Sequence, residues 1–196
     1  MNKMGIALTM GLVALGATGA ATAAEGEWNW LAGTKEGYKM EPAVSLLFGV
    51  MKPDLDGVDA QAAFGLEFSL NCPLIQPPTN KIREQVSFTM FKDGDYKQNS
   101  LELSPHYVVE VSKGLWFGGG PGLGVIFAEG KHGHGTTTEK HDDTVFGFQV
   151  GASLHYTAAA PFFAGAEARY QITSKANDIG DNLNNLRAML KVGMSF

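Results

Sequence analysis

Apolar residues recur at every second position in several stretches of this chain. In an extended strand successive side chains point to opposite faces, so each such stretch would have one apolar face and one mostly polar face. The clearest run lies within residues 60–71, where apolar residues alternate with small or polar ones. The final run ends on an aromatic residue, and its apolar positions are Leu186, Ala188, Leu190, Val192, Met194 and Phe196.

Turn-forming residues separate eight such stretches, and they predict eight strands. A transmembrane strand needs about 9–11 residues, which these stretches reach. An even number of antiparallel strands lets the last pair with the first, which removes the unpaired edges that a membrane cannot satisfy. The predicted fold class is all-β, a single closed antiparallel eight-stranded transmembrane β-barrel. The expected strands are Tyr38–Met51, Ala60–Asn71, Ile82–Phe91, Ser100–Ser112, Leu115–Glu129, Thr144–Tyr156, Pro161–Thr173 and Leu186–Phe196.

Proline and glycine modify two of these strands. Pro105 lies inside the fourth and cannot donate a ladder hydrogen bond, so either a bulge is expected there or the strand assignment is weakened. In the fifth strand, glycines share one face with Trp116, and glycines in register leave room where a barrel interior is crowded. They are Gly118, Gly120, Gly122 and Gly124.

The charged residues decide which face meets lipid. A soluble barrel would turn its polar face to water, but the polar positions here are mostly small and neutral, with too few charges to coat a barrel. A few opposite charges suit a narrow, filled lumen, where buried charges must be paired. Such residues could also line a proton or ion path, but a packed electrostatic plug is favoured. The expected lumenal ionic network is Glu67, Glu110, Glu167, Arg169, Arg187 and Lys191.

The N-terminus has the features of a secretory signal peptide. Lys3 precedes a short apolar core, and residues 21–23 form an Ala-Thr-Ala cleavage site. We assign residues 1–23 to the signal peptide, with cleavage after Ala24 as a close alternative. Residues 24–37 are expected to form a periplasmic lead-in and residues 38–196 the barrel domain. An N-terminal membrane anchor is disfavoured because the apolar core is too short for a span.

Composition excludes some functions. Loss of Lys3 with the signal peptide takes the formal net charge from −5 to −6, which argues against nucleic-acid binding. Cys72 is the only cysteine, so an internal disulfide is excluded. In an exported protein an odd cysteine could pair between chains, but an unpaired thiol in a turn is the expected state.

The glycine-rich stretch Gly118–Gly124 and the ending Lys191–Phe196, set on eight alternating strands, resemble the small eight-stranded outer-membrane barrels of the OmpA-, OmpX- and OmpW-like group. The resemblance spans about Tyr38 to Phe196 and identifies a class. It implies an outer-membrane location among lipid and lipopolysaccharide, with the terminal Phe196 read by the barrel-assembly machinery. It also implies a role in structure, adhesion or host interaction, or a narrow pathway for small or greasy solutes.

From a periplasmic start, the loops after the first, third, fifth and seventh strands lie outside the cell. They include the two longest polar stretches, Gly130–Asp143 and Ser174–Asn185. Long outer loops and short periplasmic turns are the expected asymmetry, from which the proline-rich segment 72–80 departs.

The stretch Gly130–Asp143 offers three candidate ligands for a divalent ion. Nothing in it provides a rigid frame, so no metal or other cofactor is expected. The candidates are His132, His134 and His141.

Catalysis is the remaining candidate. Residues 166–174 look a little like the active strand of the lipid A 3-O-deacylases, which carry a His and a Ser two apart after an Arg-Tyr pair. Ser174 matches the nucleophile, but Ile172 stands where the His would be, so the hydroxyl lacks a general base. Ser153 and His155 share a lumenal face, where a structural hydrogen bond is expected. We therefore expect no enzymatic activity.

The predicted function is a structural or surface-interaction role through the extracellular loops, with an extracellular ligand or host surface as partner. A narrow pathway or binding site for small or hydrophobic solutes is the alternative. A wide pore is not expected, because an eight-stranded barrel has room for little beyond side chains.

Overall fold

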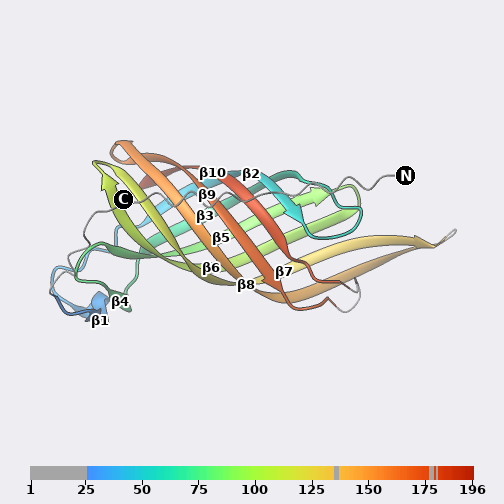
Figure 1. Cartoon of the computed structure of the whole chain (residues 1–196), viewed down its shortest axis with the longest axis horizontal. Helices are drawn as coiled ribbons and strands as arrows, with labels where there is room; N and C mark the ends of the chain where they lie inside the picture. The colour runs from blue at the N-terminus through green and yellow to red at the C-terminus, as the bar shows by residue number, and fades with distance from the viewer. Residues whose placement is uncertain (1–25, 135–136, 177–178, 180) are drawn as a thin grey trace, which may run out of the picture.

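Eight antiparallel strands close into a barrel in the computed structural model, which describes residues 26–134, 137–176, 179 and 181–196 (Figure 1). The last strand pairs with the first from Asn185↔Pro53 to Ser195↔Ala43, which removes the sheet edge. The predicted fold class is confirmed. The barrel strands are β2 (Ala43–Pro53), β3 (Gln61–Asn71), β5 (Lys81–Asp93), β6 (Tyr96–Ser112), β7 (Leu115–His134), β8 (Thr137–Ala159), β9 (Phe162–Thr173) and β10 (Asn185–Ser195).

The outside of the barrel is apolar and the inside polar. Phe64, Phe148 and Val192 expose 56%, 48% and 52% of their surface, whereas Glu67 and Lys191 expose 4% and 3%. Every barrel strand contributes large exposed apolar side chains to this belt. A continuous apolar belt of this kind is unfavourable in water and is stabilised by lipid, so the outer face is the lipid-facing one.

The barrel differs from the sequence prediction mainly in the connections. A tight turn at Gly94 joins β5 to β6, so both strands extend into the segment between the predicted strands Ile82–Phe91 and Ser100–Ser112. The ladder between β7 and β8 continues to His134↔Thr137. Most of the stretch Gly130–Asp143 is therefore not a loop but the end of a hairpin, which extends beyond the rest of the barrel (Figure 1). Ladder hydrogen bonds join backbone groups and do not require an apolar face.

Pro105 does not bulge the sheet. The pairs Leu103↔Leu123 and Tyr107↔Gly119 on either side of it keep one register, and β6 is continuous, so neither the bulge nor the weakened strand assignment considered for Pro105 is found. A Cβ at Gly120 would lie 2.0 Å from the Pro105 carbonyl oxygen, so only glycine permits this close approach. The register shift between β6 and β7 lies instead between residues 110 and 112.

The two ends of the barrel have different structures. We call the end with Ala43 and Ser195 the terminal end, and the opposite end, with the β7–β8 hairpin, the loop end. At the terminal end β1 (Asn29–Trp30) pairs with β4 (Ile75–Gln76), and the short 3-10 turn η1 (Ala32–Thr34) follows β1. The long proline-rich connection between β3 and β5 therefore serves as the partner of the lead-in.

Among the described residues, no helix has the length and apolarity that a helical membrane span requires. The signal peptide predicted at residues 1–23 lies outside the described residues, so that prediction stays an expectation.

Candidate functional site

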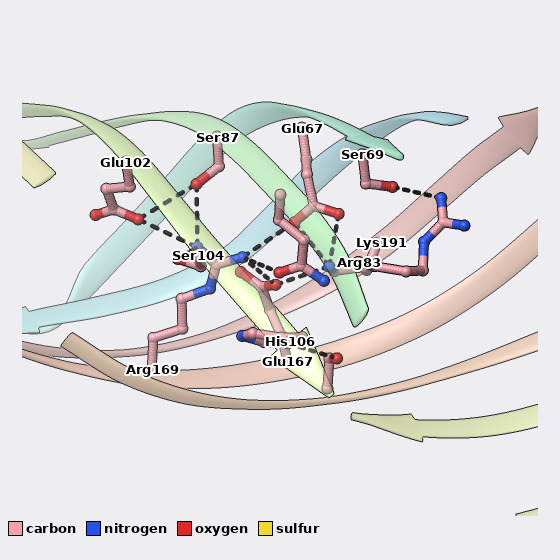
Figure 2. A network of polar contacts seen from close by, with 12 residues as sticks. Glu67, Ser69, Arg83, Ser87, Glu102, Ser104, His106, Glu167, Arg169 and Lys191 are labelled. Carbon is pink, nitrogen blue, oxygen red and sulfur yellow. Dashed lines mark hydrogen bonds and ion pairs between the residues drawn. The ribbon is translucent and has the colours of Figure 1, made fainter. Parts of the chain in front are cut away.

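The middle of the lumen holds a cluster of three acids and three bases, which we call the lumenal ion network; Figure 2 labels its members other than Arg187. Its members stand on inward-facing positions of four strands, and each is buried. They are Glu67 on β3, Glu102 on β6, Glu167 and Arg169 on β9, and Arg187 and Lys191 on β10.

Arg169 lies at the centre of this network. Its Nη2 donates to Glu67 Oε2 at 3.0 Å and to Glu167 Oε2 at 2.9 Å, and its Nη1 lies 3.2 Å from Glu102 Oε2. Further bonds go to the Ser87 hydroxyl at 3.1 Å and the Gln85 amide oxygen at 3.0 Å. One planar guanidinium thus bridges all three acids, because its donors diverge in a fixed fork.

The other two bases complete the pairing. Lys191 Nζ lies 2.8 Å from Oε2 of both Glu67 and Glu167, and Arg187 pairs with Glu102. Each carboxylate therefore has two basic partners, and the six charges sum to zero. Buried charges are tolerable only when they are paired and hydrogen-bonded. Here every charge has a partner of opposite sign and a hydrogen bond, although the Nε of Arg169 and the Nε of Arg187 have no partner among the described residues. The network can brace the strands against one another. For an ion or solute to pass through the lumen, the ion pairs of this network would have to separate.

Glycines on β7 provide space for the network. A Cβ at Gly124 would lie 2.8 Å from the Cγ of Glu102, and a Cβ at Gly122 would lie 2.4 Å from the Ser104 hydroxyl. The Gln149 amide nitrogen donates to that hydroxyl at 2.7 Å and lies against the same glycine. The expectation that the glycine face leaves room in a crowded interior agrees with these contacts.

Above the network, toward the loop end, the lumen is filled by apolar side chains. They come from several strands and from the β9–β10 connection, and Met51, Ile126 and Leu183 expose none of their surface. Leu55, Val58 and Ile179 cover this apolar cluster from the loops. The charged side chains of the network thus block the lumen in its middle, and the apolar side chains block it nearer the loop end.

Five of the six residues expected in the lumenal network lie in it, but Glu110 does not. Glu110 is exposed near the terminal end, and its carboxylate accepts a hydrogen bond from the Gly114 backbone N–H at 2.8 Å. The residue that alternation should have added is Glu102, which has the same parity on the same strand. Parity identifies the face of a strand but not the height along the barrel.

The other candidate residues do not form a second site among the described residues. The Ser153 hydroxyl contacts Nδ1 of His106 at 3.2 Å, and His155 stacks on Trp116 instead. Ser174 is exposed, with its hydroxyl 3.5 Å from the Phe146 carbonyl oxygen.

The metal-binding hypothesis concerns His132, His134 and His141. Their side chains lie outside the described part of the chain, so the hypothesis stays untested. Within the described part, no group of three or more His, Cys, Asp or Glu residues could hold a metal ion.

No protein-family model and no curated protein matches this chain. Solved structures do match it. Neisserial surface protein A superposes with a TM-score of 0.58 at 16% identity, over 80% of this chain and 97% of that one. The N-terminal β-barrel domain of Pseudomonas aeruginosa OprF superposes with a TM-score of 0.50 at 16% identity, over 81% and 100%. Ail, the attachment invasion locus protein of Yersinia pestis, superposes with a TM-score of 0.51 at 17% identity, over 81% and 100%.

At these identities the likeness concerns the fold. The apolar belt around the barrel would be unfavourable in contact with water, so the barrel spans a membrane. Membrane-spanning antiparallel barrels of this kind are outer-membrane structures. With such a belt around this fold, the chain is a small eight-stranded β-barrel protein of the outer membrane.

Proposed function

We propose that this protein is a non-catalytic outer-membrane barrel that binds an extracellular ligand or a host surface through its loop end. The observation that carries the proposal is the blockage of the lumen in its middle and toward the loop end. The lumenal ion network and the apolar cluster occupy the barrel in series, so its interior favours a rigid support over a conduit. Binding residues are often carried by exposed loops that a rigid scaffold holds in position.

The shape of the loop end also supports this proposal. We assign the loop end to the cell exterior, because outer-membrane barrels have short periplasmic turns and longer extracellular connections. The β7–β8 hairpin then extends outward beyond the other connections (Figure 1). One structural neighbour, Ail, is described as an attachment protein and has been solved in complex with a heparin analogue, sucrose octasulfate. A binding role for the loop end of this barrel is a consistent expectation.

The terminal residue fits a role in assembly. The Phe196 ring is 70% exposed on the outside of the terminal end, while its backbone N–H donates to the Pro42 carbonyl oxygen at 2.9 Å. We infer that the barrel-assembly machinery reads this ring before insertion and that lipid and lipopolysaccharide surround the finished barrel.

Trimming the hairpin tests the surface-binding proposal. Gly130 and His141 face each other in the ladder, so residues 131–140 can be replaced by an Asn-Gly turn without changing the register. Cells displaying the trimmed protein should lose adhesion to immobilised heparin and to epithelial monolayers, while the barrel still folds. A Lys92→Gln variant, changed at an exposed site on the same end, is the matched control and should keep adhesion. Equal adhesion of the trimmed and intact proteins would overturn the proposal.

Planar-bilayer recordings test the solute-pathway alternative independently. The filled lumen predicts no steady ion conductance from the intact barrel. Stable single-channel steps that depend on the protein would contradict this and favour the pathway. Unchanged lipid A in cells overexpressing the protein is the expected result for a barrel without catalytic activity.

A further inference from the structure

The lumen is not filled at its terminal end. A cavity of about 210 Å³ opens there below the lumenal ion network, and side chains from all eight barrel strands line it. Glu67 and Lys191 of the network form part of its lining. We call it the terminal cavity. It is accessible from water at this end and closed on the other side by the network.

One wall of the terminal cavity is aromatic. Trp116 on β7 and His155 on β8 are cross-strand partners, and their rings stack with centroids 6.2 Å apart and planes 7° apart. Phe163 on β9 meets His155 edge-on, with the ring centroids 5.9 Å apart. Gly193 leaves the space for the Phe163 ring, since a Cβ there would lie 2.3 Å from the ring. The three rings form an aromatic wall in this part of the lumen.

Cations lie beside this aromatic wall, and Lys81 Nζ lies over the Trp116 ring, 5.4 Å from its centroid. Arg83 on β5 is mostly buried, and its guanidinium donates to neutral oxygens: Ser69 Oγ at 3.0 Å, Asn71 Oδ1 at 3.2 Å and the Glu41 backbone carbonyl at 3.1 Å. Its contact with the Glu41 carboxylate is long, at 4.0 Å. That carboxylate pairs closely with Lys81. Arg83 is therefore oriented firmly while its charge is only weakly neutralised.

The Glu41 carboxylate stays committed to Lys81. Burial raises the pKa of this carboxyl, but the hydrogen bond and the charge of Lys81, together with the Asn71 side chain and the charge of Arg83, outweigh burial and lower the pKa overall. Glu41 is therefore ionised at neutral pH. Its backbone also has a left-handed φ of 46°, which a non-glycine residue adopts only when its surroundings impose it. Arg83 and Lys81 hold this residue at the mouth of the cavity.

The charges lining the terminal cavity do not balance. Lys81, Arg83 and Lys191 contribute three positive charges, and Glu41 and Glu67 contribute two negative ones. The network behind it is neutral, so the excess positive charge belongs to the cavity. A ligand with one negative charge would complete the balance, and the aromatic wall would accept a planar apolar group.

We propose that the terminal cavity binds a small aromatic carboxylate, with its carboxylate on Arg83 and its ring against Trp116 and Phe163. The size agrees, because an apolar cavity of about 150 Å³ holds a benzene ring, and the larger volume here leaves room for a carboxylate. A carboxylate beside Arg83 would gain a charge-assisted hydrogen bond, which is roughly twice as strong as a neutral one. This site is separate from the loop-end binding proposed above and does not depend on it.

Fluorine NMR of para-fluorobenzoate with the full mature barrel in phospholipid nanodiscs tests this site. Saturable line broadening is expected, with a dissociation constant on the order of 1 mM for so small a ligand. Unlabelled benzoate should displace the probe, while benzyl alcohol, which lacks the charge, should displace it at least about tenfold less well. Absence of saturation up to about 10 mM, or equal displacement by the neutral alcohol, would overturn the proposal.

Two variants test which side chains of the terminal cavity contact the carboxylate and the ring of the ligand. Arg83→Gln retains donors for Ser69 and Asn71 but loses the charge, and it should weaken binding at least about tenfold. Trp116→Leu should weaken binding of the ring. Lys97→Gln removes a cation from the loop end and should leave binding unchanged. Heat-modifiable gel migration verifies folding, and wild-type affinity in a folded Arg83→Gln barrel would contradict the assignment.

Discussion

Removal of the Arg169 charge tests whether the lumenal ion network holds the barrel together. In an Arg169→Met variant the three acids would share two bases, and one buried negative charge would be left uncompensated. Breaking a buried pair in this way costs about 3–5 kcal/mol. Glu67 would keep Lys191 and Glu102 would keep Arg187, so we expect a loss near the lower limit, about 3 kcal/mol.

A second substitution distinguishes charge balance from packing. Glu167→Gln in the Arg169→Met background restores equal numbers of acids and bases and leaves two one-to-one pairs. The double variant should therefore be more stable than the sum of the two single losses predicts, by at least about 1 kcal/mol. If Arg169 acted only through its volume, the two effects would simply add.

Reversible urea unfolding in phospholipid vesicles, followed by tryptophan fluorescence, measures these free energies. Lys97→Gln is the control, because Lys97 and Glu129 form a partly exposed pair at 3.4 Å, and such pairs contribute about 0–1 kcal/mol. The reasoning fails if Arg169→Met unfolds within about 0.5 kcal/mol of the wild type, or if the double-variant losses are additive.

Three further changes test packing, the lipid face and the thiol. Gly120→Ala should destabilise the barrel by about 1–3 kcal/mol in the same unfolding assay, because its Cβ would collide with a carbonyl oxygen. The control is Gly130→Ala on the same strand, which should be neutral because a Cβ there meets nothing within 4 Å. Leu123→Arg, on the outer face at mid-strand, should lower the free energy of unfolding by about 2–4 kcal/mol. Val111→Arg, near the strand end, should lower it by about 0–1 kcal/mol, and equal losses would contradict the assigned lipid face. Burial raises the pKa of the Cys72 thiol, so at pH 7 the folded protein should react with maleimide at least about tenfold more slowly than the urea-unfolded chain and should form no disulfide-linked dimer on a non-reducing gel.

The sequence by itself determined the class of fold and the face that meets lipid. The period-two alternation states for each residue whether it points in or out, and that information is local to a strand. The apolar positions of β3 and β10 therefore predict the lipid-facing belt, and the opposite parity assigns Glu67, Glu167 and Lys191 to the lumen.

Tertiary structure decided which charges meet. Glu67 and Arg169 are separated by 102 positions in the chain, and their contact depends on the register and tilt of every strand between them. Glu102 and Glu110 illustrate the limit, because they share one face of β6, yet the first enters the network and the second lies exposed beside Gly114. The terminal cavity likewise combines side chains from all eight strands, and the hairpin beyond Gly130 forms where the apolar pattern ends. Alternation records the face of each residue, whereas height along the barrel arises only when the sheet closes.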